Sequence, residues 1–226
     1  MVSRQMKVSF LPVLGLTLFL AAPAQADLVV NGSFEQGNSG FTTNYIYSPG
    51  DVVPTRTFAL VTDPAAAFPN PSAASSFGDH TTGSGLMMVV NGASLPGVLV
   101  WGQIVAVVPN NQYTLSAYIA SWSGGSPGQL DVSINGTSLG TLTAPATTGV
   151  WVPFSATWDS GSATSAVIQL KNLSTSNLGN DFALDDIAFS GPNPFDAPEP
   201  ASVVYVLTSS LALGLGSLSR RSQRQH

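Results

Sequence analysis

The residues best suited to chemistry are four carboxylates that the chain carries in three separate segments. Asp185 and Asp186 are adjacent near its end, whereas Glu35 and Asp79 lie in its first half. Strict alternation along a strand would place Asp185 on the side of the apolar Ile187 and Asp186 on the opposite side. Unless a bulge intervenes, one of the two carboxylates then faces apolar neighbours, where an unpaired charge is strongly unfavourable. That carboxylate needs a cation or several hydrogen-bond donors.

A metal ion is the simplest partner for such a carboxylate. Between residues 27 and 200 the chain has only two basic side chains, Arg56 and Lys171, and one histidine, His80, and it has no cysteine at all. The available ligands are therefore oxygen atoms, which favour Ca²⁺ over zinc. The alternative is that Glu35 caps a turn and that the Asp185–Asp186 pair is solvated at the end of a strand.

The same residues argue against catalysis. A glycosidase needs two carboxylates that face each other across a cleft, but neighbours on one strand point to opposite faces. Gly124–Gly128 matches the G-x-S-x-G pattern of serine hydrolases, yet a strand-like segment follows it where that motif requires a helix. His80 is the only histidine before the tail that could act as the base. We therefore expect no catalytic residues and a protein that is not an enzyme, with a hydrolase as the alternative.

Aromatic side chains in loop-like segments are candidates for binding sugars. The apolar face of a sugar stacks on an exposed aromatic ring, while amides and carboxylates bind its hydroxyl groups. Tyr45, Tyr47 and Trp122 lie in such segments, and His80 follows Asp79 in a loop rich in Gly and Thr. Each has an alternative role, the aromatic rings in the core and His80 as a structural hydrogen-bonding residue. Three further tryptophans are equally suited to the core: Trp101, Trp151 and Trp158.

The segments that must position these residues read as β-strands. Asn135–Gly136 is a two-residue turn signal, and no window between residues 27 and 200 has the 3.6-residue period of a helix. Eight or nine short strands predict an all-β sandwich, with long irregular stretches at 41–54 and 64–84. Six of the predicted strands are residues 86–90, 98–108, 112–119, 130–134, 150–158 and 166–170.

The first 26 residues have the pattern of a secretory signal peptide. Arg4 and Lys7 precede an apolar run over residues 8–22, and Ala24-Gln25-Ala26 places small residues where a signal peptidase reads them. We expect cleavage by signal peptidase and a mature chain that starts at Asp27. The alternative is an N-terminal anchor that is not cleaved.

The other end resembles the PEP-CTERM sorting signal of Gram-negative bacteria, which the membrane enzyme exosortase handles. Pro198-Glu199-Pro200 is followed by residues 201–218, which carry no charge, and then by Arg220, Arg221 and Arg224. The span is just long enough to cross a membrane as a helix, with the arginines in the cytoplasm. The resemblance implies a linker over 193–200, a transmembrane sorting helix over 201–219 and a basic cytoplasmic tail over 220–226. It also implies that Pro198, Glu199 and Pro200 direct removal of the tail; a permanent single-pass anchor is the alternative.

A second resemblance covers most of the remaining chain. Asn31-Gly32-Ser33-Phe34-Glu35, the Gly78–Gly85 stretch with the Met-Met-Val-Val-Asn-Gly that follows it, and Asp181–Ile187 resemble galactose-binding-like jelly rolls, a superfamily that includes carbohydrate-binding modules. The resemblance implies a single jelly-roll β-sandwich over 27–192. It also implies a structural Ca²⁺ that bridges the first and last strands. Its implied ligands are Glu35 and Asp186, followed by Asp185 and Asp79.

The charge balance excludes some partners. The segment between residues 27 and 200 has twelve acidic and two basic residues, so that its formal net charge is −10. A chain this acidic is a poor binder of nucleic acids and is repelled by anionic lipid surfaces.

These patterns together predict an exported protein. We expect it to cross the inner membrane, to be held there transiently by its C-terminal helix, and then to reach the cell surface or the extracellular space. Its expected function is to bind extracellular polysaccharide through a calcium-stabilised β-sandwich. A structural or adhesive matrix protein without glycan specificity is the main alternative. An ice-binding protein is a weaker one, because Thr141-Leu142-Thr143 alone is not a flat threonine array.

Overall fold

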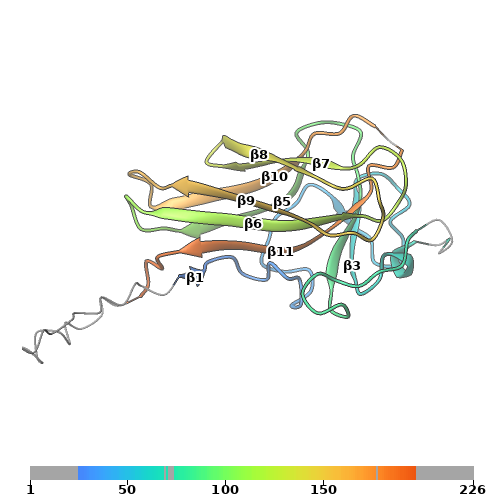
Figure 1. The fold of residues 1–226 in the computed structure, drawn as a ribbon, viewed down its shortest axis with the longest axis horizontal. Helices are drawn as coiled ribbons and strands as arrows, with labels where there is room; N and C mark the ends of the chain where they lie inside the picture. The colour runs from blue at the N-terminus through green and yellow to red at the C-terminus, as the bar shows by residue number, and fades with distance from the viewer. Residues whose placement is uncertain (1–24, 69, 71–73, 177, 197–226) are drawn as a thin grey trace, which may run out of the picture.

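Two β-sheets stacked face to face form the part of the chain that the computed structural model describes, which is residues 25–68, 70, 74–176 and 178–196 (Figure 1). The strands are β1 (Ala26–Asp27), β2 (Ile46–Tyr47), β3 (Thr57–Val61), β4 (Met87–Asn91), β5 (Leu99–Ala106), β6 (Gln112–Ser121), β7 (Gln129–Ile134), β8 (Thr137–Thr143), β9 (Val152–Asp159), β10 (Ser165–Asn172) and β11 (Phe182–Gly191). One 3₁₀ turn, η1 (Pro64–Ala67), is the only helical element in these residues. The all-β prediction is confirmed, and each of the six predicted segments coincides with a strand.

The larger sheet has the order β2-β3-β4-β11-β6-β9, with β1 also paired to β11, and the smaller sheet has the order β5-β10-β7-β8. Leu115 and Ile119 of β6 meet Ile168 and Leu170 of β10 in a core from which water is excluded. Alternation explains this core, because every second residue of an amphipathic strand points to the same side. The β7–β8 hairpin turns at Asn135–Gly136 with φ angles of 51° and 80°, as the turn signal predicted.

A second apolar cluster lies on the outer side of the larger sheet. Ala183 of β11 and Met87 and Val89 of β4 are fully buried there, although they point away from the main core. Ala67 of η1 and the ring of Trp122 pack onto them from the loops. Much of the irregular stretch after β3 is therefore a packed cover over this end of the sheet.

Strand β11 changes partners halfway along its length. Phe182–Leu184 pair with β4, but from Ile187 onward the N-terminal segment takes that place, because Ile187 N donates to Gly32 O at 3.0 Å and Leu28 N donates to Phe189 O at 2.9 Å. The β6–β11 register shifts between Asp185 and Ala188, where Asp186 has a φ of 47°. This bulge marks the switch.

The bulge overturns the expected placement of the two aspartates. Asp185 points to the outer side of the sheet, whereas Ile187 points into the core. The extra residue breaks the alternation that would have put Asp185 and Ile187 on one side. Asp185 is nevertheless completely buried, because a loop covers it from outside.

Several predictions from the two ends of the chain fall on residues outside the described range. They concern the signal peptide, the sorting residues Pro198, Glu199 and Pro200, and the 201–226 segment with Arg220 and Arg221. Among the residues that the structure describes, no helix has the length and apolar character needed to cross a bilayer.

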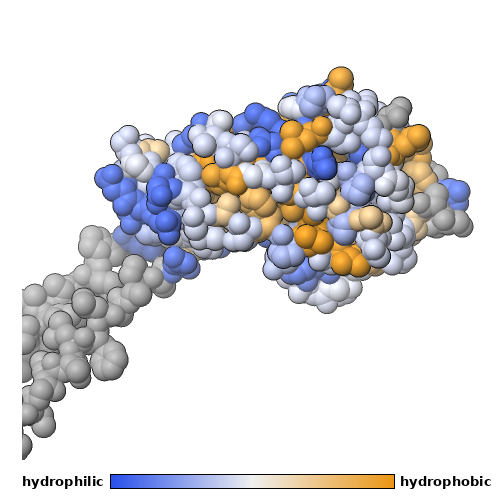
Figure 2. Space-filling model, turned by 45° about the horizontal axis from the view of Figure 1, so that its top comes forward, coloured by the Kyte–Doolittle hydropathy of each residue, from blue (hydrophilic) through white to orange (hydrophobic). Residues whose placement is uncertain are grey.

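The exposed large apolar side chains are distributed over several elements. They include Ile46 of β2, Ile104 of β5 and Leu178 in the loop before β11, which are 66%, 70% and 76% exposed. Figure 2 shows the apolar residues of one face in several groups among residues of mostly intermediate hydropathy. Single exposed apolar residues are ordinary on a protein surface and do not by themselves mark a binding site.

Candidate ligand-binding site

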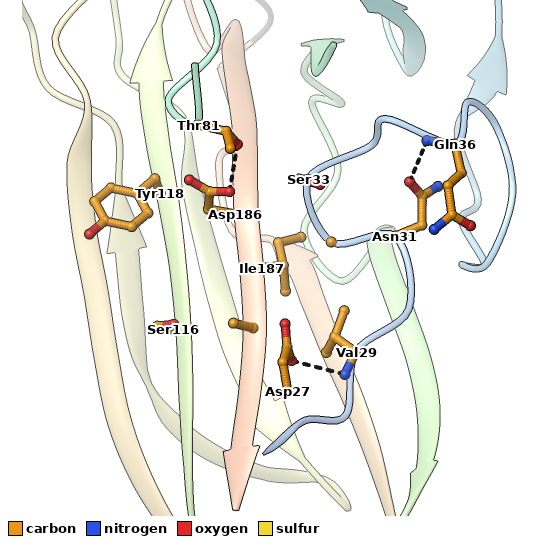
Figure 3. Close-up of a pocket in the computed structure, with 12 residues that line it drawn as sticks. Asp27, Val29, Asn31, Ser33, Gln36, Thr81, Ser116, Tyr118, Asp186 and Ile187 are labelled. Atoms are coloured by element: carbon orange, nitrogen blue, oxygen red, sulfur yellow. Dashed lines mark hydrogen bonds between the residues drawn. The ribbon is translucent and has the colours of Figure 1, made fainter. Parts of the chain in front are cut away.

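A pocket of about 450 Å³ opens where the N-terminal segment, the bulge of β11 and the outer face of β6 meet (Figure 3). Its lining combines carboxylates, side-chain amides, hydroxyl groups and one aromatic ring. The residues that line it are Asp27, Val29, Asn31, Gly32, Ser33, Gln36, Thr81, Ser116, Tyr118, Asp186, Ile187 and Ala188.

The loop over residues 78–85 is fastened to the bulge by the buried Asp185. His80 N donates to Asp185 Oδ2 at 2.8 Å and Thr81 N donates to the same oxygen at 3.2 Å, while Asp186 N donates to Asp185 Oδ1 at 2.9 Å. Burial raises the pKa of Asp185 to about 6, and the neighbouring Asp186 carboxylate adds to the rise, although these N–H donors oppose it. Donors from the loop thus satisfy the buried carboxylate.

Asp186 lines the pocket, and the side chains of His80 and Thr81 hold its carboxylate in place. Asp186 Oδ2 lies 2.6 Å from His80 Nδ1, and its Oδ1 accepts a hydrogen bond from Thr81 Oγ1 at 2.6 Å. The His80 ring stacks on Tyr118, with centroids 3.5 Å apart and an interplanar angle of 19°. The position of the Tyr118 ring is therefore fixed before any ligand arrives.

Asp79 and Glu35 meet at the other end of the same loop. Asp79 accepts hydrogen bonds from Thr82 N at 2.8 Å and Gly85 N at 2.7 Å, and Glu35 Oε1 accepts one from Leu86 N at 2.8 Å. Burial raises the pKa of Asp79, but these donors outweigh burial, so that its pKa lies below the ordinary value. A Cβ on Gly85 would overlap Glu35 Oε1 and lie 3.0 Å from Asp79 Oδ2, which shows how closely the two carboxylates approach.

The predicted calcium ligands therefore form two pairs. Asp185 and Asp186 lie under the start of the loop, and Glu35 and Asp79 lie at its end. Ca²⁺ takes six to eight oxygen ligands, and within the described residues no three His, Cys, Asp or Glu side chains converge on one point. A calcium ion at the Glu35–Asp79 pair would need backbone carbonyls and water molecules to complete its shell. Calcium stays a prediction.

The N-terminal wall of the pocket is held by side-chain hydrogen bonds. Asp27 Oδ1 accepts from Val29 N at 3.0 Å and from Phe189 N at 2.9 Å. Asn31, with a φ of 59°, donates through Nδ2 to Gly37 O and Ser39 O at 2.8 Å each, and its Oδ1 accepts from Gln36 N at 2.9 Å. The Asp27 contact to Phe189 fixes the segment to β11, and the Asn31 contacts fix the shape of the loop that follows.

Tyr45 and Trp122 take the alternative role that the sequence left open for them, in the packed interior. Tyr45 is 5% exposed and its hydroxyl group accepts a hydrogen bond from Ala93 N, while Trp122 is 1% exposed and its Nε1 donates to Val90 O at 3.0 Å. Burial raises the pKa of Tyr45 to about 12. Both rings are parts of the packed interior. The sequence around each ring has the pattern of a loop, but in the structure other loops cover both rings.

The other aromatic candidates differ in how far they are buried. Tyr47 is exposed on β2 and packs against Phe58 rather than lining the pocket. Trp101 is buried in the main core, as its alternative role predicted, and Trp151 and Trp158 are half-buried.

The structure brings three sequence segments together and adds residues that sequence reasoning missed. The 31–35, 78–85 and 181–187 segments, which were singled out for their composition, all meet at the bulge. Tyr118, Ser116 and Asp27 were not predicted as site residues. A signal for Tyr118 was present, because it is an aromatic residue on the polar face of an alternating strand.

No protein-family model and no curated protein matches the chain. Its structural neighbours include carbohydrate-binding modules. Family 16 Carbohydrate Binding Module-2 is 22% identical over 72% of this chain and 98% of that chain, with a TM-score of 0.44. The CBM22-1 xylan-binding domain of Paenibacillus barcinonensis Xyn10C is 16% identical over 75% and 96%, with a TM-score of 0.43. A cyclase from Fischerella sp. TAU, solved in complex with 4-(1H-indol-3-yl)butan-2-one, is 18% identical over 74% and 98%, with a TM-score of 0.48.

Proposed function

We propose that this chain is an exported protein that binds a glycan in the pocket between the N-terminal segment, β6 and β11, and does no chemistry on it. Export through the leader and processing by signal peptidase and exosortase are parts of the proposal, and they rest on the sequence patterns at the two ends. A structural or adhesive role in the matrix, without affinity for a defined glycan, is the competing function.

The single observation that carries the proposal is the mixture of groups in the pocket. Sugars are recognised by an aromatic surface together with a few amides, carboxylates and hydroxyl groups that are already in position. Tyr118 supplies the ring, Gln36 an amide, and Asp27 and Asp186 the carboxylates. Asn31 offers only its amide oxygen, because both of its Nδ2 hydrogens are donated to Gly37 O and Ser39 O. The His80 ring stacked on Tyr118 and the hydrogen bonds of Asp27 and Asn31 already hold these side chains in place. Binding therefore costs little conformational entropy in the pocket.

The polar surface continues beyond the pocket along the outer face of the larger sheet. Ser116 pairs across the strands with Ser155, and Thr114 pairs with both Thr157 and Ser190. Short hydroxyl side chains leave room for an extended ligand and offer both donors and acceptors. A glycan chain longer than one sugar unit therefore fits this face.

The described residues support binding better than hydrolysis. A His–Asp pair such as His80–Asp186 orients the base in many hydrolases, but such a base must also reach a nucleophile. The structure describes no hydrogen bond from the second ring nitrogen of His80 to a serine or threonine, and the ring stacks on Tyr118 instead. Ser126 of the G-x-S-x-G match lies in an exposed loop, where its N–H donates to Leu178 O.

Filling the pocket tests the proposed function. Ser116→Phe places a large ring on the pocket floor of a strand that tolerates aromatic residues, so it should weaken binding at least about tenfold without unfolding the protein. Thr143→Phe on the exposed side of β8 is the matched control and should bind as the wild type does. Retention of the purified protein on a panel of insoluble polysaccharides, with melting temperatures alongside, is the measurement. Equal retention of all three proteins, or no retention of any, contradicts the proposal and favours the matrix role.

The predicted calcium ion has its own test. Calcium at about 100 times its Kd should stabilise the wild type by about 2.7 kcal/mol, which is about 5 °C or more in melting temperature. Glu35→Gln should remove this gain and leave the melting temperature in chelator little changed, because the amide oxygen can still accept from Leu86 N. Identical melting temperatures of the wild type in calcium and in chelator would contradict the predicted calcium site.

A further inference from the structure

The outer face of the larger sheet is accessible along only part of its length. On β6 the outward-facing Tyr118 is half-buried, but Ala120, the next residue on the same face, is completely buried. The neighbouring strand β11 shows the same change, because Ala188 is half-buried whereas Ala183, the partner of Ala120, is completely buried. Both strands therefore run under packed loops beyond the level of Tyr118.

The border of these loops, residues 74–85, crosses the sheet as a wall. Beside the start of β9, Trp151 Nε1 donates to Gly78 O at 3.2 Å. At β11, Thr81 Oγ1 donates to Asp186 Oδ1 at 2.6 Å, and Figure 3 shows this pair at one end of the pocket. A wall that is packed and hydrogen-bonded on both strands cannot move aside cheaply for a ligand.

The loop over residues 31–37 closes the pocket on a second side. Ser33 and Gln36 line the pocket from this loop. Leu86 N, directly after the first wall, donates to Glu35 Oε1 at 2.8 Å, so that the two walls are joined at their corner. A chain that passes straight through a site needs openings on opposite sides. In the described structure, two adjacent walls leave an extended chain no such passage.

The pocket is open in the direction in which β11 ends. There the outer face carries short hydroxyl side chains, with Ser116 and Thr114 of β6 paired to Ser155 and Thr157 of β9. Both side chains of β9 are exposed. A strand rises about 3.3 Å per residue, so Thr114 lies about 13 Å from Tyr118 along β6. This open face has room for sugar units beyond the one in the pocket.

From these walls we infer that the pocket binds the end of a glycan chain and not an internal segment. The inference rests on the proposed function and names the part of the glycan that is recognised. The terminal sugar unit lies against Tyr118, and the rest of the chain leaves over Ser116 and Thr157. A terminal unit carries one more free hydroxyl group than an internal unit, and the polar groups of the two walls bind it.

The number of proteins bound per glycan chain tests the inference. Cellulose, chitin, xylan and β-1,3-glucan form the retention panel, and each polysaccharide that retains the wild type is cut by partial hydrolysis into shorter and longer soluble chains. Isothermal titration calorimetry should give one protein per chain and the same Kd per chain for both lengths, because a linear chain has a single end of the recognised kind. Internal binding would give several proteins per longer chain.

Thr157→Val tests the direction in which the chain leaves. Valine removes one hydroxyl group and is a good strand former, so the fold should be unchanged. Binding of both chain lengths should weaken about two- to tenfold, as expected for one lost hydrogen bond, with one protein still bound per chain. Thr143→Val on the exposed side of β8, in the other sheet, is the matched control and should bind as the wild type does.

Each outcome can be assigned to one of the two proposals. Several proteins on each longer chain would overturn the inference while glycan binding stands. An unchanged Kd of Thr157→Val would overturn the inferred direction of the chain. If no polysaccharide of the panel retains the wild type, or if Ser116→Phe is retained equally, the proposed function itself fails, and the inference fails with it.

Discussion

Replacing Gly32 by alanine should destabilise the protein by about 3 kcal/mol and lower its melting temperature by about 6–12 °C. A Cβ at this position would overlap the carbonyl oxygen of Ile187 and lie 2.9 Å from its carbonyl carbon and 3.0 Å from Val29 Cγ1. Backbone atoms of a strand cannot move aside cheaply. The N-terminal segment would have to separate from β11 at the point where Ile187 N donates to Gly32 O.

Gly124→Ala is the control for this prediction. Gly124 lies in an exposed loop, and a Cβ there would have no atom within 4 Å. Its melting temperature should stay within about 2 °C of the wild type, since surface substitutions away from special features change stability little. Thermal unfolding followed by circular dichroism measures both variants. Equal melting temperatures for the two would mean that the segment does not dock on β11 as described.

Gly32→Ala should also weaken glycan retention at temperatures where the variant is still folded. Gly32 and Ile187 both line the pocket, so that their separation widens the site. The Ser116→Phe variant should lose retention without losing stability. The pair of variants therefore distinguishes a pocket that is filled from a pocket whose wall has moved.

The strands of this fold could be predicted because their alternation is local. On β6 the odd positions from Tyr113 to Ile119 are buried and the even positions from Gln112 to Tyr118 are not, as a period of two requires. The same alternation would have identified Tyr118 as an aromatic ring on a polar face. The local alternation of residues therefore predicts one wall of the pocket, the outer face of β6.

The remaining walls could not be predicted from local pattern. They depend on contacts between residues more than a hundred positions apart, such as His80 N to Asp185 Oδ2. The bulge that separates Asp185 from Ile187 leaves only a weak trace in the sequence, since aspartate is one of several residues that tolerate a positive φ. The same limit applies to Trp122, which reads as a loop residue until η1 and its flanking loops are packed over it.

Asp185→Asn should change how the stability of the protein depends on pH. In the folded protein the pKa of Asp185 is about 6, against an ordinary value of 3.8, so the native state holds this proton more tightly than the unfolded chain does. The stability that this proton contributes is fully present below the ordinary value and is lost as the pH rises through 6. The loss amounts to about 3 kcal/mol by pH 7.5, or about 6–12 °C in melting temperature.

Asp185→Asn has no ionisable group at this position, so the test compares how the free energy of unfolding of the two proteins depends on pH. From about pH 4.5 to 7.5, the wild type should lose about 2 kcal/mol more stability than Asp185→Asn does, as measured by urea unfolding, because about a third of the contribution is already lost at pH 4.5. Asp186 and His80 face the same site and are unchanged in both proteins, and Asp51→Asn is the control for a carboxylate in an exposed loop. Parallel profiles for the wild type and Asp185→Asn would contradict the prediction. A steeper wild-type profile would mean that burial and the neighbouring Asp186 carboxylate disfavour the ionised form of Asp185 in the folded protein by more than the N–H donors of the loop favour it.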